Sequence, residues 1–194
     1  MNKIRNSLKV FFFMLCVIQI VVLIIFFSAA YNNVRLLNSD RIQVNSKQDQ
    51  WLLSTEHGHN STEISKNLIM DQNIIIKDYK TILLIELLFS IIVFVFTSIS
   101  LIKFMRVYFE TAKTNTPFSI TNVKNIKQSS ICIMIAYGFV PIIKPFLYFS
   151  IFLKSTIYFS FENILLLLTT ILLFILSKVF YYGCYLQEEY DNTL

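Results

Sequence analysis

Two ionisable residues, Glu86 and Lys144, lie inside long apolar runs of the sequence. A charge in such a run is a functional candidate, and a partner of opposite charge is expected nearby. Glu86 lies five residues after the start of its run, and Lys144 lies eight residues before the end of its own. At helical rise these depths are roughly 7–8 Å and 12 Å, so long side chains could meet. Two roles are open for the pair. It is either a structural ion pair, in which each charge offsets the desolvation cost of the other, or part of a transport path.

No other residues form a recognisable catalytic or metal-binding set. His57 and His59 are the only histidines, and two ligands fall short of the three or four protein ligands of a zinc site. Cys16, Cys132 and Cys184 show no C-x-x-C spacing. A Ser/His/Asp set and paired carboxylates within the apolar runs are also missing from the sequence. We therefore expect no enzyme, no catalytic residues, no metal and no cofactor.

The apolar runs are long enough to cross a bilayer. The chain is 55% hydrophobic and 15% charged, whereas soluble domains are about 25% charged. About 20 apolar residues at ~1.5 Å rise span a ~30 Å hydrocarbon core. Backbone polar groups cannot go unpaired in lipid, so each run should be helical. We expect one all-α membrane domain, residues 1–194, with four transmembrane helices at 10–30, 81–102, 129–152 and 163–182.

The first run resembles a signal peptide only in part. Its basic start (Lys3, Arg5 and Lys9) and the small residues Ser28 to Ala30 fit such a peptide. Its apolar stretch is longer than the usual 7–15 residues, which favours a retained anchor.

Lysine and arginine counts orient the four spans. The first nine residues carry three basic groups and no acid, and residues 103–128 carry five basic groups and one acid. The long loop 31–80 is balanced at six of each sign. Because basic loops stay in the cytoplasm, both termini, loop 103–128 and the tail 183–194 are expected inside. Loop 31–80 is expected outside, where its short apolar pieces "RIQV", "WLL", "NLIM" and "NIII" predict partial order.

The cytoplasmic loop contains the stretch "TNTPFSITNVKNIKQ". Pro117 ends any helix that continues from the second span, and Ser119 can cap a new one. Apolar residues then share one helix face and lysines the other: Ile120, Val123 and Ile126 against Lys124 and Lys127. The lysines suit anionic headgroups. Nucleic-acid binding is not expected from so few basic residues without a reading motif.

The tail ends on three acidic residues, Glu188, Glu189 and Asp191. By the charge rule it shares the cytoplasmic side with Lys124 and Lys127. Three interpretations stay open: a solvated helix end, docking on the protein's own loop, and binding to a basic surface of a partner. Stability alone explains the acids poorly, since exposed ion pairs contribute only ~0–1 kcal/mol.

The stretches "NTPFSITNVKNIKQ" and "GCYLQEEYDNTL" together resemble the bacterial DUF2975 family of small four-span membrane proteins. The first motif is matched by Pro117, Phe118, Ser119, Asn122, Val123 and Lys124. The second motif is matched by Leu186, Gln187, Glu188, Glu189, Asp191 and Thr193, with Tyr190 and Asn192 as departures.

The resemblance implies a multi-pass protein of the bacterial cytoplasmic membrane, often encoded beside a small helix-turn-helix regulator. The resemblance predicts a regulatory or interaction protein. The residues of the two motifs, together with Lys127, are then expected to bind a cytosolic partner. One alternative is a small transporter or channel that uses Glu86 and Lys144 and would need to form a homo-oligomer. A second alternative is an immunity-type protein that protects its cell from a toxin.

Overall fold

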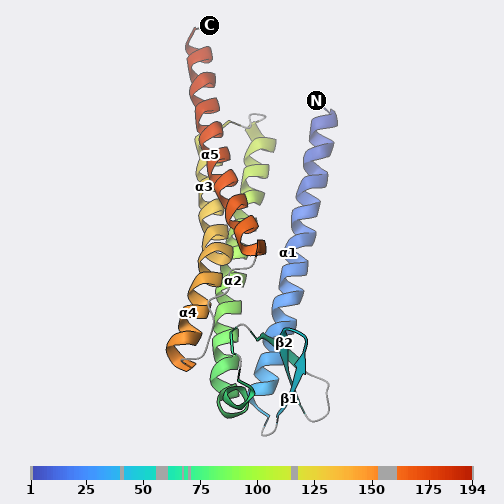
Figure 1. Ribbon diagram of the computed structural model, residues 1–194. Coiled ribbons are helices and arrows are strands. Elements are labelled where there is room, and N and C mark those ends of the chain that lie inside the picture. Colours follow the sequence, from blue (N-terminus) through green and yellow to red (C-terminus); the bar gives the residue numbers. More distant parts are fainter. Residues whose placement is uncertain are drawn as a thin grey trace. The chain divides into compact units, whose positions relative to one another are not determined.

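The structure is a computed structural model, and it is 83% helical (Figure 1). It describes residues 2–39, 42–55, 61–66, 68–69, 71–114, 118–152 and 161–193. Pro117, His57 and His59 lie outside these ranges. In chain order the elements are α1 (Asn2–Leu37), β1 (Ile42–Lys47), β2 (Gln50–Thr55), β3 (Ser61–Ser65), α2 (Gln72–Thr114), α3 (Ile120–Ile133), the π-helix η1 (Met134–Phe139), α4 (Val140–Phe152) and α5 (Phe161–Thr193).

Four helical stretches are long and apolar enough to cross a membrane, as the sequence predicts. They lie in α1, in α2, in the continuous run from α3 through η1 to α4, and in α5. Their apolar side chains are largely exposed: only 6% of the apolar window of α1 and 11% of that of α5 is buried. A water-soluble protein does not expose contiguous apolar surface on this scale. The exposed faces suit contact with lipid.

The helices run well beyond the expected spans. Helix α2 has 43 residues, which at ~1.5 Å per residue is about twice the thickness of a bilayer core. No glycine or proline interrupts it, and the one departure from helical geometry is a kink at Asp78 (φ −116°, ψ 23°). Helix α5 likewise continues to Thr193, so the tail extends the fourth helix.

Ser119 caps α3 as the sequence predicts. Its backbone is extended (φ −136°, ψ 147°), and its side chain accepts a hydrogen bond from the backbone N–H of Asn122 at 3.1 Å. The backbone N–H of Val123 donates to the carbonyl of Ser119 at 3.0 Å. The cap satisfies donors that every helix start leaves unpaired, so the sequence itself sets where α3 begins.

The expected all-α fold class did not include a sheet, but residues 31–80 contain a three-stranded antiparallel sheet. Its order is β1-β2-β3, with Val44 opposite Leu53 and Leu53 opposite Thr62. The turn between β1 and β2 places Gln48 at a positive φ of 42°. The strands have only five or six residues each, and such short apolar pieces do not distinguish a strand from a helix by periodicity. The class is therefore mainly helical with one small sheet.

The chain divides into two compact units. One unit contains Met1–Val22, Val95–Gly138 and Glu162–Leu194, and the other contains Leu23–Phe94 and Phe139–Phe161.

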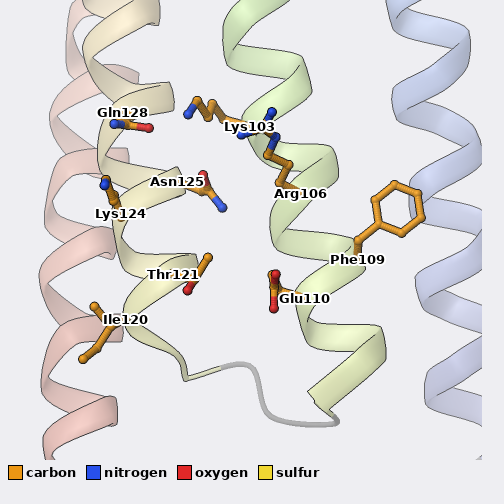
Figure 2. A pocket seen from close by; sticks show the side chains of 9 residues that line it. All are labelled: Lys103, Arg106, Phe109, Glu110, Ile120, Thr121, Lys124, Asn125 and Gln128. Carbon is orange, nitrogen blue, oxygen red and sulfur yellow. The ribbon is translucent and has the colours of Figure 1, made fainter.

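In the first unit, α3 lies antiparallel to the C-terminal part of α2 (Figure 2). The hydroxyls of Ser100 and Ser129, both buried, lie 2.5 Å apart. Further along, the amide of Asn122 donates to the hydroxyl of Thr111 at 3.1 Å. These polar contacts between the two helices fix their register, because shifting either helix would break both pairs.

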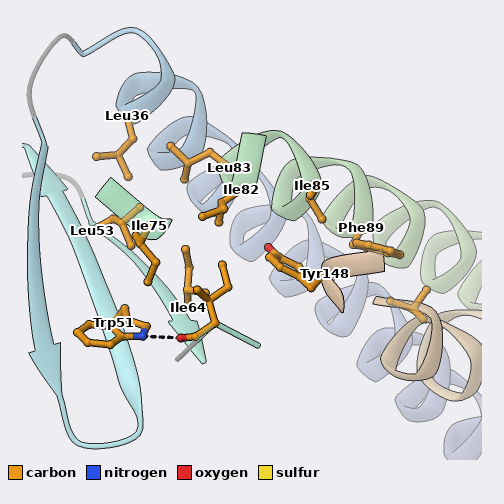
Figure 3. Close-up of a cluster of buried hydrophobic side chains, with 12 residues drawn as sticks. Leu36, Trp51, Leu53, Ile64, Ile75, Ile82, Leu83, Ile85, Phe89 and Tyr148 are labelled. Atoms are coloured by element: carbon orange, nitrogen blue, oxygen red, sulfur yellow. Dashed lines mark hydrogen bonds between the residues drawn. The ribbon is translucent and has the colours of Figure 1, made fainter. Parts of the chain in front are cut away.

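The second unit has a hydrophobic core (Figure 3). It joins the end of α1, the sheet, the start of α2 and α4 through Leu36, Trp51, Leu53, Ile64, Ile69, Ile75, Ile82, Leu83, Ile85, Phe89, Val140 and Tyr148. The indole N–H of Trp51 donates to the carbonyl of Ile69 at 2.7 Å, so the one polar atom of this side chain is satisfied. The core packs the sheet against α1, α2 and α4.

Candidate functional site

Glu86 and Lys144 form an ion pair in the second unit. Lys144 Nζ lies 2.7 Å from Glu86 Oε2. The phenol of Tyr148 donates to Glu86 Oε1 at 2.8 Å. The side chains of Lys144 and Glu86 are 23% and 16% exposed, and Tyr148 is fully buried. Both carboxylate oxygens therefore have a partner, as a buried charge requires.

Sequence reasoning did not find Tyr148, although a signal was present. Tyr148 follows Lys144 by four residues, so on a helix both side chains lie on the same face one turn apart. Both carboxylate oxygens of Glu86 are bonded, to Lys144 and to Tyr148, and this arrangement suits a structural ion pair. A proton-transfer role would require one of these bonds to break.

A cavity of about 610 Å³ is lined in part by Glu86. Its other walls combine apolar and polar side chains of α1, β3 and α2: Ile24, Ile25, Ser28, Ala29, Asn32, Asn33, Ser61, Thr62, Glu63 and Ser90. Asn33 is buried, and its Oδ1 accepts a hydrogen bond from the Thr62 hydroxyl at 2.7 Å. The cavity brings solvent-sized space to Glu86 in the second unit.

The first unit brings the two sequence motifs together where α3 begins and α5 nears its end. The ring of Phe118 packs edge-on against that of Phe180, with 5.4 Å between centroids. It also covers Gly183, where a Cβ would come within 2.5 Å of Phe118 Cδ1. Only glycine allows an approach this close. Phe118 thus anchors the end of the loop to the start of the tail.

We call this contact region the loop–tail junction, and a cavity of about 310 Å³ opens on it. Its walls are Phe118, Ser119, Ile120, Cys184, Gln187, Glu188 and Asn192. The junction therefore contains Phe118 and Ser119 of the first motif and Gln187 and Glu188 of the second.

The remaining motif residues have varied surroundings. Asn122 is fully buried and Val123 half-buried in α3, whereas Lys124 is exposed. Lys127 lies over the ring of Phe174 of α5, 6.0 Å from its centroid. Leu186 and Glu189 are exposed on α5. Asp191 belongs to α5, but its side chain is not among those described, and Pro117 is outside the described ranges.

The tail contacts the loop through the aromatic packing of Phe118 on Phe180 and Gly183. Glu188 is exposed beside the junction cavity. The three interpretations of the acidic residues stay predictions, although the helix of the tail contacts the loop at Gly183.

No group of three or more His, Cys, Asp and Glu residues that could hold a metal occurs among the described residues. No protein-family model, curated protein or solved structure matches the chain.

Proposed function

We propose that this chain is a multi-pass membrane protein of a regulatory or interaction type. Four helices long and apolar enough to cross a bilayer support the membrane location. The lysine and arginine distribution supports a cytoplasmic loop 103–128 and a cytoplasmic tail. In this orientation the loop–tail junction faces the cytosol.

The observation that carries the proposal is the close packing of the Phe118 ring against Gly183. It joins two stretches separated by more than sixty residues into one surface, with Glu188 exposed next to it. Exposed acids contribute little to stability or to topology. A preformed surface that carries them suits recognition of a basic protein surface, because little ordering is needed on binding.

The proposed partner is a basic cytosolic protein of the small helix-turn-helix regulator class. This choice follows the resemblance to the DUF2975 family, which also supports a bacterial cytoplasmic membrane. The membrane protein would hold such a regulator at the bilayer through the loop–tail junction.

Affinity purification in mild detergent from the native host tests this proposal. The intact chain is compared with the double variant Glu188→Lys/Glu189→Lys and with the control Asp49→Lys, which reverses an exposed charge in the β1–β2 turn. We expect a helix-turn-helix protein with the intact chain and the control, and its loss from the double variant. Equal recovery with all three would contradict docking at the acidic tail.

A second candidate, a small transporter or channel, is favoured by the cavity beside Glu86. In this function Glu86→Gln and Lys144→Met would each abolish flux in proteoliposomes although the variants remain folded. Full flux in either variant, or none in the intact chain, would contradict transport through this pair.

A further inference from the structure

A second cavity of the first unit, of about 630 Å³, lies between the C-terminal part of α2 and the start of α3 (Figure 2). Lys103 and Arg106 extend into it from α2, and Lys124 lines it from α3. Glu110 is the one acid in its wall. We call it the basic cavity.

The basic cavity has an excess of positive charge. Within the described residues none of its three cations forms an ion pair, so their charge is not neutralised by a carboxylate there. Lys103 and Arg106 are three residues apart and therefore share one face of α2. The first turn of α3 lines the same cavity through Ile120 and Thr121. A phosphate group fits this environment, because arginine and lysine both bind it through charge-assisted hydrogen bonds.

The cavity also contains uncharged polar groups with bonding capacity. Oε1 of Gln128 is buried and has no hydrogen-bond partner among the described residues. The neighbouring side chain of Asn125 is 6% exposed and also lines the space. A buried carbonyl oxygen without a donor costs free energy, and a ligand hydroxyl would supply that donor. The lining thus suits a phosphate that carries a hydroxylated substituent.

The position of Lys103 relates the basic cavity to the membrane surface. Lys103 directly follows the expected second span, which ends at Ile102. Cations just beyond the end of a span meet lipid headgroups. A phosphate group held at this level therefore suits a lipid better than a free anion.

We propose that the basic cavity binds the phosphoglycerol headgroup of an anionic phospholipid. Lys103, Arg106 and Lys124 hold the phosphate, and the Gln128 amide accepts from a glycerol hydroxyl. The inference rests on the membrane location in the proposed function and not on a protein partner, since the cations Lys103, Arg106 and Lys124 do not line the cavity at the loop–tail junction.

The test reconstitutes the purified full-length chain in phosphatidylcholine nanodiscs and titrates fluorescent phosphatidylglycerol. The double variant Lys103→Gln/Arg106→Gln is compared with Lys113→Gln, which removes an exposed charge of α2 outside the cavity. We expect binding about fivefold weaker for each cavity cation removed, and affinity near that of the intact chain for the control. Lys124→Gln, an exposed position on α3, repeats the test if the double variant misfolds. Equal affinity in cavity and control variants would overturn the proposal.

Competition separates the sources of the phosphate. Unlabelled phosphatidylglycerol should displace the probe, whereas inorganic phosphate and soluble glycerol phosphate should not. Displacement by either soluble anion at millimolar concentration would overturn the lipid assignment. Gln128→Leu should lower the preference for phosphatidylglycerol over phosphatidic acid, which lacks the glycerol hydroxyls, and an unchanged preference would overturn the role of Gln128. A chain that does not enter nanodiscs would contradict the membrane location itself.

Discussion

The ring of Phe118 covers Gly183 so closely that a methyl group there would come within 2.5 Å of Phe118 Cδ1. This relationship joins the loop before α3 to the tail helix α5. It accounts for a glycine in the interior of α5, where alanine would favour the helix by roughly 0.5–1 kcal/mol. The glycine is needed for packing and not for backbone freedom.

Gly183→Ala should therefore weaken the loop–tail junction despite its better helix propensity. The added methyl group forces the Phe118 ring to move, and overpacking of this kind costs about 1–3 kcal/mol. Thermal unfolding in detergent measures the loss.

Gly138→Ala is the matched control for this substitution. Its Cβ would meet the side chains of Met134 and Leu167 at 3.6 and 3.8 Å, which are ordinary contacts. We expect its unfolding temperature to stay close to that of the intact chain. Equal destabilisation by both alanines would show that the Phe118 contact does not matter.

Removing one member of the Glu86–Lys144 pair should cost more than removing both charges. Lys144→Met leaves the Glu86 carboxylate, which is 16% exposed, without its counter-charge, and removing one partner of a mostly buried pair costs up to about 3 kcal/mol. The double variant Glu86→Gln/Lys144→Met should recover much of that loss. A double-mutant cycle on unfolding free energies measures the coupling, and additive losses would contradict it.

The exchanged pair Glu86→Lys/Lys144→Glu provides a further check. The two charges would still face each other, and the Tyr148 hydroxyl can accept from a lysine as well as donate to a carboxylate. The exchanged protein should fold and approach the stability of the intact chain. Failure to fold while the uncharged double variant folds would argue against a purely structural pair.

Tyr148→Phe should lower the unfolding free energy by about 1.5–3 kcal/mol. The ring stays packed in the core, but one charge-assisted hydrogen bond to Glu86 is lost. Tyr185→Phe, at an exposed position of α5, should change stability by less than about 0.5 kcal/mol. Chemical unfolding followed by circular dichroism compares the two, and similar values would show that the Tyr148 hydroxyl contributes nothing.

Ser119→Ala should destabilise the start of α3 by about 1 kcal/mol, because the backbone N–H of Asn122 loses its acceptor. Ser119→Asp keeps an acceptor and should restore the loss. Hydrogen exchange of the first turn of α3 reports the effect locally. If alanine and aspartate give the same exchange rates, the cap does not set the helix start.

Local features of this protein could be predicted from its sequence because their causes are local. The apolar windows depend on run length and hydropathy, and they appear as four long helices. The start of α3 depends on the hydroxyl of Ser119, which acts within three residues. The depths of Glu86 and Lys144 follow from counting residues at a constant helical rise.

The remaining features depended on how distant segments pack. Tyr148 joins Glu86 only because α4 turns that face toward α2, and apolar periodicity does not specify which faces meet. The three short strands form a sheet because each pairs with a neighbour, which no single strand encodes.

At the tail, charge left three interpretations open, whereas the tertiary structure packs Phe118 against Gly183 and exposes Glu188. Exposed charges gain little from pairing, whereas close packing of a ring against a bare backbone removes apolar surface from water and excludes other arrangements. The sequence by itself determined the four long apolar helical stretches and the start of α3. The packing of side chains from distant segments determined which residues meet.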